Sequence, residues 1–372
     1  MLSKLTGFFR REPVLSIAAL AAIVTAFFAP FSLKAIGEAI DWRVLALLFC
    51  LMAVVQGLEG AGLFEKLAQS AIQRAGSLRG LCAVLVLLCF SSSMLVTNDV
   101  ALLTFVPFAV LVLRGAGFEK HLLYVVVLQT AAANLGSMAT PVGNPQNLFL
   151  FSRYQMSAPY FFIRVLPVAG LSLLLLLLLL LPIPRGSLSV QSGQSPRPLS
   201  LKAILPYGIL FALCLCTVLH LVPYPITFVL VLLYLAVKDR PILRRVDYGL
   251  LLTFVFFFLF VGNLGAIPPV KQALYQAIQG REMIACTLMS QVISNVPAAV
   301  LLSGFTEKGG ALLLGSNLGG LGTLVASLAS LISFRLYGKA QPEQKGRYLL
   351  YFTLVNVLLL LLLLPLCLLL DR

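Results

Sequence analysis

The segment EMIACTLMSQVISNVPAAVLLSGF (282–305) is apolar at both ends and polar in the middle. The interruption Ser294-Asn295-Val296-Pro297 leaves two arms of about 9–12 residues, roughly 14–18 Å long as helix. The hydrocarbon core of a bilayer is about 30 Å thick, so neither arm can cross it. Two short arms joined at a polar tip are typical of a re-entrant hairpin, and we predict one here.

A second polar interruption lies in the first half of the chain. The apolar run 81–96 stops at Thr97-Asn98-Asp99 and resumes over 100–113. These arms are longer than those of 282–305. The segment 81–113 is therefore either a second re-entrant hairpin or two full spans.

The two interruptions belong to an internal repeat of three blocks in the same order. The matched pairs are IDWRVLALLFCLMAVVQGLEG (40–60) with VDYGLLLTFVFFFLFVGNLG (246–265), LVTND (95–99) with VISNV (292–296), and NLGSMATPVG (134–143) with NLGGLGTLVA (317–326). Repeats in secondary transporters are usually inverted in the membrane, with binding sites where helices are broken. We therefore predict two inverted halves, 13–183 and 203–370, joined by a linker at 184–202.

The composition is that of a polytopic membrane protein. Hydrophobic residues make up 60% of the 372 residues and charged residues 11%, against about 45–50% and about 25% in soluble domains. The mean hydropathy is +1.01. These values exclude a soluble enzyme, a nucleic-acid-binding domain and a secreted disulfide scaffold. We predict an all-α fold of about 9–11 transmembrane helices with two re-entrant hairpins.

The net charge of +14 is expected to lie mainly in cytoplasmic loops. When the N-terminus is placed in the cytoplasm and both hairpins are re-entrant, more than twice as many Lys and Arg fall inside as outside. Counting 81–113 as two full spans leaves this distribution unchanged. We predict a multi-pass protein of the bacterial inner membrane, with a cytoplasmic N-terminus and a cytoplasmic linker at 184–202.

The hairpin tips offer two complementary ion sites. A helix that ends at a break has free carbonyls that suit Na⁺, and one that begins there has free N–H groups that suit an oxyanion. Ser93 and Ser290 lie one turn before the tips. The candidate tip residues are Thr97, Asn98, Asp99, Ser294, Asn295 and Pro297, with Na⁺ expected at Thr97, Asn98, Ser294 and Asn295. The alternative is that these groups only bond neighbouring helices.

A second pair of predicted breaks covers 134–147 and 317–330. Glycine and proline recur so often in the first of these segments that a continuous helix is excluded. The candidate site residues there are Asn134, Gly136, Thr140, Pro141, Gly143, Asn144 and Asn147, with Asn317 and Thr323 in the second segment. The alternative is a kinked helix whose backbone is covered by neighbours.

Asp99 stands out because an intramembrane carboxylate usually marks an ion or proton path. Its alternative role is to cap the helix that begins at the break. Glu59 also lies near a span end, where it is expected at the membrane interface. We expect the same of His121 and His220.

Several motifs are absent from the sequence. It contains no GxxxxGK[ST], HExxH or GxSxG. We therefore expect no nucleotide-driven pump and no enzyme, and no cofactor other than Na⁺ or H⁺ as a coupling ion.

Three strings, TNDVALLTFVP (97–107), TPVGNPQN (140–147) and SQVISNVP (290–297), resemble the citrate-transporter-like domain of the ion transporter superfamily. That group includes divalent-anion:sodium symporters, arsenite permeases and certain sodium/proton antiporters, and the resemblance covers roughly 40–335. It implies that a Ser-Asn-Thr motif at each tip holds Na⁺ and a substrate carboxylate. Val296 and Asp99 depart from this pattern, and Asn98-Asp99 is more similar to arsenite permeases. The resemblance also implies a homodimer with an elevator-like movement.

We expect a secondary active transporter for a small anion or oxyanion, either di/tricarboxylate-like or arsenite-like, coupled to Na⁺ or H⁺. One alternative is cation/proton antiport with Asp99 as the titrating group. Another is a passive anion channel on the same scaffold. The expected partners are the small anionic solute, the lipid bilayer and a second copy of the chain, and we expect no nucleic acid.

Overall fold

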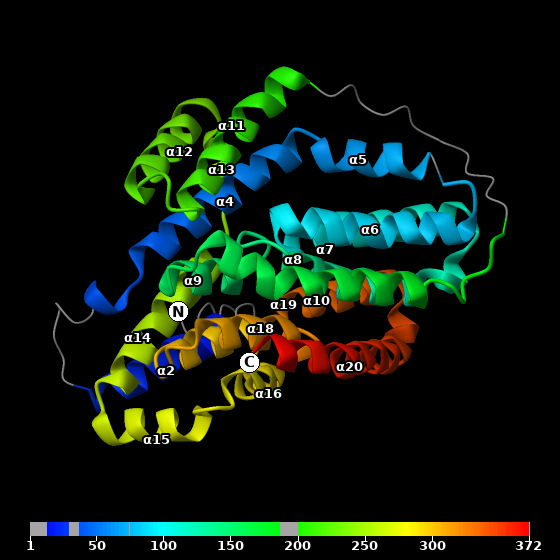
Figure 1. The fold of residues 1–372 in the computed structure, drawn as a ribbon. Coiled ribbons are helices and arrows are strands. Elements are labelled where there is room, and N and C mark those ends of the chain that lie inside the picture. Colours follow the sequence, from blue (N-terminus) through cyan, green and yellow to red (C-terminus); the bar gives the residue numbers. More distant parts are fainter. Residues whose placement is uncertain (1–12, 30–36, 74, 187–199, 372) are drawn as a thin grey trace, which may run out of the picture.

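The structure is a computed structural model that describes residues 13–29, 37–73, 75–186 and 200–371. These residues form helices and turns and contain no β-strand (Figure 1). The prediction of an all-α fold is confirmed. The first residues, 1–12, and most of the 184–202 linker lie outside the described residues.

The first half of the chain contributes eight α-helices to the described structure. They are α2 (Pro13–Ala26), α4 (Trp42–Gly60), α5 (Leu63–Ile72), α6 (Leu78–Val96), α7 (Asn98–Gly115), α8 (Leu122–Ser137), α9 (Pro145–Arg153) and α10 (Ala158–Leu179). A short 3₁₀ helix, η1 (Glu119–His121), precedes α8.

The second half contains the remaining helices of the described part. They are α11 (Leu201–Val218), α12 (Tyr224–Lys238), α13 (Arg240–Leu243), α14 (Tyr248–Gly265), α15 (Pro268–Ile278), α16 (Glu282–Ile293), α17 (Asn295–Ser303), α18 (Gly309–Gly319), α19 (Leu328–Ala340) and α20 (Lys345–Leu370). Two 3₁₀ helices, η2 (Leu324–Ala326) and η3 (Pro342–Gln344), flank α19.

Seven helices of the described part are long and apolar enough to cross a membrane: α4, α6, α7, α10, α11, α14 and α20. Large apolar side chains are exposed along several of them, for example Leu174 and Leu178 on α10 and Leu361 on α20. Exposed apolar surface of this extent suits a lipid environment. Both arms of the 81–113 segment are among the seven, so their length alone is compatible with either prediction for that segment.

The two halves repeat one order of elements. In each half a long helix is followed by a short surface helix, a hairpin, a broken helix and a second long helix. The first set is α4, α5, α6–α7 (hairpin 1), α8–α9 and α10, and the second is α14, α15, α16–α17 (hairpin 2), α18–α19 and α20. Equivalent helices run in opposite directions, as α10 and α20 do in Figure 1.

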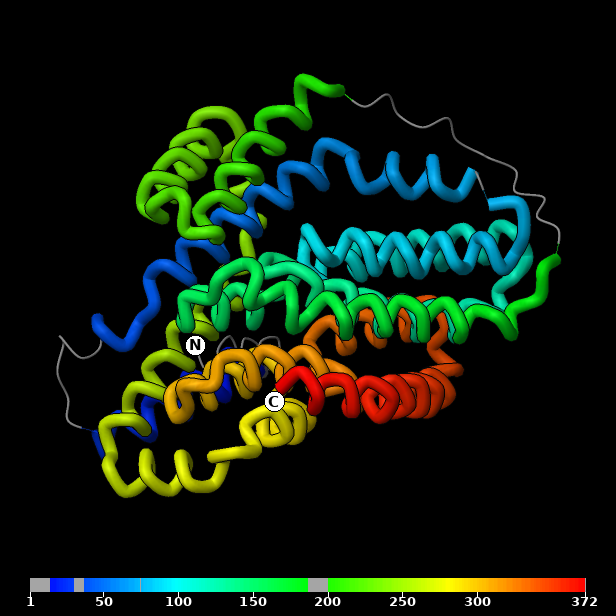
Figure 2. The backbone as a smooth tube through the Cα atoms, viewed as in Figure 1, coloured from blue at the N-terminus to red at the C-terminus, as the bar shows by residue number. Residues whose placement is uncertain are grey.

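The repeat also governs which helices pack together. In both halves the first arm of the hairpin packs along the first part of the broken helix, α6 on α8 and α16 on α18. The helix that begins each half packs on the other half: α2 packs on α14, and α11 packs on α4. The smooth tube in Figure 2 shows that this arrangement draws segments distant in sequence together.

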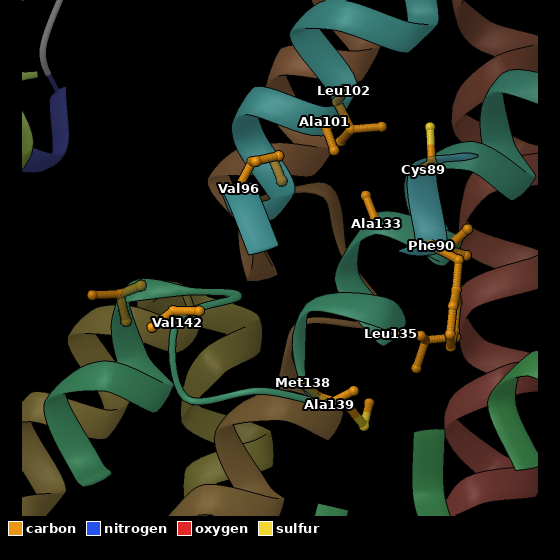
Figure 3. Packing of buried hydrophobic residues seen from close by; sticks show 14 of the residues in the cluster. Cys89, Phe90, Val96, Ala101, Leu102, Ala133, Leu135, Met138, Ala139 and Val142 are labelled. Carbon is orange, nitrogen blue, oxygen red and sulfur yellow. The ribbon is translucent and has the colours of Figure 1, made fainter. Parts of the chain in front are cut away.

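Small residues allow the hairpins to approach the broken helices closely. A Cβ built on Gly136 would lie 2.7 Å from Ser93 Oγ, and one on Gly319 would lie 2.6 Å from Ser290 Cβ. Both distances are too short for a side chain, so glycine is required at each crossing. Close backbone approach of this kind drives helix association in lipid. Figure 3 shows the apolar packing around the first crossing, with Phe90 of α6 and Leu135 of α8.

Candidate functional site

The two hairpin tips share one strained backbone conformation. Thr97 has φ 76° and ψ 151°, and Ser294 has φ 76° and ψ 155°. This region of φ/ψ space is almost restricted to glycine and costs about 1–3 kcal/mol for other residues. Such strain is concentrated at functional sites, and here it occurs at both positions predicted from the repeat.

An asparagine begins the outgoing helix at each tip. The side-chain Oδ1 of Asn98 accepts a bond from the Asp99 N–H at 3.1 Å, and that of Asn295 accepts one from the Val296 N–H at 3.0 Å. Both asparagines are buried. Pro297 lies in the first turn of α17, where proline is tolerated because the N–H groups there have no helical partner.

The broken helices are interrupted more narrowly than predicted. Helix α8 continues to Ser137 and α9 begins at Pro145, so the first break covers 138–144. Helix α18 continues to Gly319 and α19 begins at Leu328, so the second covers 320–327. Asn134 and Asn317 therefore lie in the last helical turn before each break.

Asn134 connects its own broken helix to that of the other half. Its Oδ1 accepts a bond from Ser327 Oγ at 3.0 Å, and its Nδ2 donates to Ser330 Oγ at 3.2 Å. It also accepts a bond from Asn98 Nδ2 at 2.9 Å, which joins the tip of hairpin 1 to the crossing. All four side chains are buried.

Asn317 makes the equivalent contacts in the opposite direction. Its Oδ1 accepts a bond from Asn144 Nδ2 at 3.0 Å, and its Nδ2 donates to Asn147 Oδ1 at 2.6 Å. In the repeat, Asn144 corresponds to Ser327 and Asn147 to Ser330. The two broken helices thus cross at their breaks, and each asparagine is held by the other half of the chain.

We call this set of buried polar residues the crossing cluster. Ser137 belongs to it because its hydroxyl donates to the Asn134 carbonyl at 2.9 Å and accepts a bond from Asn144 Nδ2 at 3.1 Å. The cluster consists of Asn98, Asn134, Ser137, Asn144, Asn147, Asn317, Ser327 and Ser330.

Threonines in the breaks bind the hairpins at repeat-related positions. Thr140 Oγ1 donates to the Met94 carbonyl, and Thr323 Oγ1 donates to the Gln291 carbonyl at 3.0 Å. Each bond satisfies a carbonyl in the last turn of the incoming hairpin arm. The structure therefore brings each tip and its break together.

The other predicted site residues have less direct places in this arrangement. Ser93 and Ser290 are buried at the helix crossings with Gly136 and Gly319, and their hydroxyls donate to the carbonyls of Phe90 and Cys286 within their own helices. A role for them in binding stays a prediction.

Pro141 and Gly143 form the turn between α8 and α9. A Cβ on Gly143 would lie 2.9 Å from the Cα of Ser137 and closer still to its carbonyl oxygen, so glycine is needed for this turn. Asn144 then caps α9, because its Oδ1 accepts a bond from the Asn147 N–H at 2.8 Å. Pro145 follows as the first helical residue, a position that proline favours.

Asp99 lies apart from the crossing cluster although it follows Asn98 directly. Its side chain is partly exposed, and among the described residues no side chain donates a bond to its carboxylate. Asp247, the N-cap of α14, acts on it as a like charge. Glu59 lies elsewhere on the neighbouring α4, where its carboxylate accepts a long bond of 3.5 Å from Thr104.

Sequence reasoning did not single out Ser137, Ser327, Ser330 and Gln291. Two of these could have been found by extending the alignment of the breaks, since Ser327 and Ser330 align with Asn144 and Asn147. Gln291 aligns with Met94. Its amide donates to the Gly319 and Leu321 carbonyls at 3.0 and 2.9 Å and so supports the second break.

The chemistry of the site is that of neutral oxygen and amide groups. The crossing cluster contains no cationic side chain, and among the described residues no group of three or more His, Cys, Asp or Glu side chains could hold a metal ion. Amides and hydroxyls can coordinate a hard cation through oxygen and can donate to an oxyanion through hydrogen. The N-termini of α7 and α17 add backbone donors beside them.

A helical membrane bundle with two opposed broken helices and a polar crossing at its centre has the architecture of a secondary transporter. The family model described as "Citrate transporter" matches residues 7–306. The chain belongs to this family and is a multi-pass membrane transporter. The resemblance drawn from the three motifs is confirmed.

Individual relatives agree with this assignment. The inner membrane protein YbiR of Escherichia coli is 32% identical over 85% of this chain and 86% of its own length. The silicon efflux transporter LSI3 of rice is 34% identical over 42% of this chain and 32% of its own length. The solved structure of the YdaH transporter of Alcanivorax borkumensis, described as having an unusual topology, has a TM-score of 0.57 at 15% identity and covers 96% of both chains. That likeness shows a shared fold.

Proposed function

We propose that the protein is a secondary active transporter that moves a small, oxygen-rich acid or its anion, coupled to Na⁺ or H⁺. The observation that carries this proposal is the reciprocal clamping of Asn134 and Asn317 across the two breaks. A single central site shared by two opposed halves suits alternating access better than it suits a continuous pore.

The neutral character of the crossing cluster supports an oxygen-rich solute. Amide and hydroxyl groups hydrogen-bond to carboxylate, arsenite-like and silicate-like oxygens alike. Because the cluster holds no cationic side chain, an anionic solute needs a bound cation or the helix N-termini of α7 and α17 to offset its charge. The family model is described by citrate, which is such a solute, and LSI3 is named for the efflux of silicon, which water-soluble silicic acid would carry in an oxygen-rich form.

Asp99 is the residue we assign to coupling. It is the carboxylate next to the tip asparagine, and it has no bonded partner among the described side chains. A carboxylate in this setting can carry a proton when no cation is bound, or act as a Na⁺ ligand beside Thr97 and Asn98. Either behaviour links solute movement to an ion gradient.

Flux in proteoliposomes tests the proposal. The purified chain is reconstituted and offered labelled citrate, succinate, arsenite or silicic acid under an imposed Na⁺ gradient, pH gradient or neither. We expect at least one solute to accumulate above its equilibrium level under one gradient. Downhill movement that neither gradient accelerates would instead indicate a passive channel.

Cation/proton antiport is the second candidate, and the negative charge of Asp99 beside Asp247 favours it. In that case Na⁺ or K⁺ added outside should release protons from acid-loaded vesicles with no oxygen-rich solute present. A pH-sensitive dye measures this directly. Proton release without added acid or anion would replace the first proposal with antiport.

A further inference from the structure

The repeat provides an internal comparison of the two faces of the molecule. By the repeat, α9 corresponds to α19, α17 to α7, and α4 to α14. Helix α9 packs on α4, and α17 packs on α14. In the described residues the equivalent contacts, α19 on α14 and α7 on α4, are not comparably extensive. The face at which α9 meets α4 and α17 meets α14 is therefore closed. On the opposite face, the repeat-equivalent helices are not packed together to the same extent.

Aromatic contacts show the same inequality. The Phe149 ring of α9 lies 6.3 Å from that of Phe254 and 5.6 Å from that of Phe258, both on α14. The repeat equivalent of Phe149 in α19 is Ile332, which has no ring to offer. Phe334, the equivalent of Phe151, pairs with Tyr348 of α20 at 5.7 Å, just as Phe151 pairs with Phe161 of α10 at 5.6 Å, so the inequality is confined to Phe149.

At the closed face, α9 also contacts the turn between α11 and α12. The His220 ring stacks on Phe151 with centroids 5.6 Å apart and an interplanar angle of 12°. Arg43 of α4 donates through Nη2 to His220 Nδ1 and, at 3.1 Å, to the Thr217 carbonyl. His220 itself has φ 64°, in the left-handed region that few residues other than glycine adopt.

We propose that Arg43, His220 and Phe151 form a gate contact, which we call the outer clasp, and that acid on that face releases it. Charge distribution predicts that this face lies outside the cell. The inference rests on the proposed function in that it assumes alternating access. It adds which residues hold this face closed and which condition opens it.

The hydrogen bond fixes the protonation state of the clasp. A guanidinium has donors and no acceptor, so His220 Nδ1 must be unprotonated to bond with Arg43. Protonation of that nitrogen removes the bond and places two positive charges together. Burial, and next the charge of Arg43, lower the pKa of His220.

Among the described residues, no acidic group acts directly on His220. Arg43 is the charged group that acts on His220, and Asp41 acts in turn on Arg43. Helix α9 presents the Phe151 ring to His220, and Phe161 of α10 packs on the Phe151 ring at 5.6 Å.

The direction of the pH effect follows from this lowered pKa. Once the clasp opens, His220 is free of Arg43 and its pKa returns toward about 6.5. The open state then binds more protons than the closed state at mildly acidic pH. The closed state is favoured above about pH 6.5 and loses that advantage as the pH falls toward the lowered pKa.

Hydrogen exchange measured by mass spectrometry tests the clasp without any transported solute. Peptides from α9 and from the turn 217–224 are followed at pH 5 and pH 7.5 in wild type, His220→Gln and His121→Gln. Comparing variants at one pH removes the intrinsic pH dependence of exchange. Glutamine retains an acceptor for Arg43 but cannot be protonated in this range.

At pH 5 we expect both peptides to exchange about tenfold faster in wild type than in His220→Gln. At pH 7.5 we expect the two proteins to exchange at the same rate. His121, in η1 away from the clasp, provides the control, and His121→Gln should match wild type at both pH values. His220→Lys, which is always charged, should exchange fast at both. Equal exchange in wild type and His220→Gln at pH 5 would overturn the clasp. Because no solute is present, that result leaves the proposed transport function unaffected.

Discussion

The two hairpins share the conformation of their tips but differ in size and charge. The arms of hairpin 1 have 19 and 18 residues, and those of hairpin 2 have 12 and 9. Thr97 and Ser294 nevertheless have the same φ of 76°. The residue after the tip asparagine is Asp99 in hairpin 1 and Val296 in hairpin 2. Tip geometry is thus common to both halves, and the charge is confined to one.

This comparison separates two kinds of contribution. The features that occur twice, namely the strained tip, the asparagine and the threonine bond, are those we propose to form the site. The feature that occurs once, Asp99, is the residue to which we assign coupling. Substitutions at repeat-related positions test whether the shared features are equivalent in function.

The largest effect is expected at the paired asparagines. Asn98→Ala and Asn295→Ala should each reduce solute affinity ten- to hundredfold, because losing one buried amide partner costs about 1–3 kcal/mol. Uptake into proteoliposomes with matched protein amounts measures this. Asn263→Ala serves as the control. Its amide bonds α14 to Ala22 and Thr25 of α2 and contacts no candidate site residue, so its loss should leave solute affinity unchanged. Wild-type uptake in either tip variant would show that the two tips are not both part of the site.

The next effect concerns the charge that only hairpin 1 carries. Asp99→Asn retains the shape of the side chain and removes its charge, so solute exchange should continue while its dependence on the Na⁺ or pH gradient disappears. The measurement compares exchange with gradient-driven uptake in the same vesicles. Asp239→Asn serves as the control, because Asp239 accepts a bond from Tyr207 and is not among the groups that act on Asp99. Unchanged coupling in Asp99→Asn would indicate that Asp99 only caps α7.

The sequence predicts the helical membrane fold and the positions of the tips and breaks, because both depend on local signals. Polar residues inside apolar segments, such as Asn98 and Asn295, are visible without a structure, and the repeat connects them. The crossing partners Ser327 and Ser330 are less visible. Serine is common in membrane helices, and only the bond to Asn134 distinguishes these two from the rest.

Other features depend on tertiary contacts that no local pattern reveals. Threonine is β-branched and disfavours positive φ, so nothing in the sequence indicates the strained conformation of Thr97. His220 lies at a span end and reads as an interface residue. Its stacking on Phe151 arises from the packing of α9 beside the α11–α12 turn, between segments about 70 residues apart.

A smaller effect of opposite sign is expected at the strained tips. Thr97→Gly and Ser294→Gly should each stabilise the protein by about 1 kcal/mol, since relief of strain exceeds the entropic cost of glycine. Thermal unfolding in detergent, followed by size-exclusion chromatography, measures the change. Ser290→Gly, in the ordinary helical backbone one turn earlier, should instead destabilise by about 1 kcal/mol. Destabilisation by all three substitutions would mean that the tips are not strained.

The smallest effect tests whether the two threonine bonds are equal. Thr140 and Thr323 both donate to a hairpin carbonyl, but Thr140 is partly buried whereas Thr323 is exposed. A lost bond costs more where water cannot replace it, so Thr140→Val should destabilise by about 1 kcal/mol and Thr323→Val by about 0.5 kcal/mol or less. The same thermal assay measures both. Thr253→Val removes a hydroxyl that bonds only within α14 and serves as the control, with little change expected. Equal losses of stability in Thr140→Val and Thr323→Val would show that water is excluded from the second break as well as from the first. The two faces would then differ only in their gate contacts.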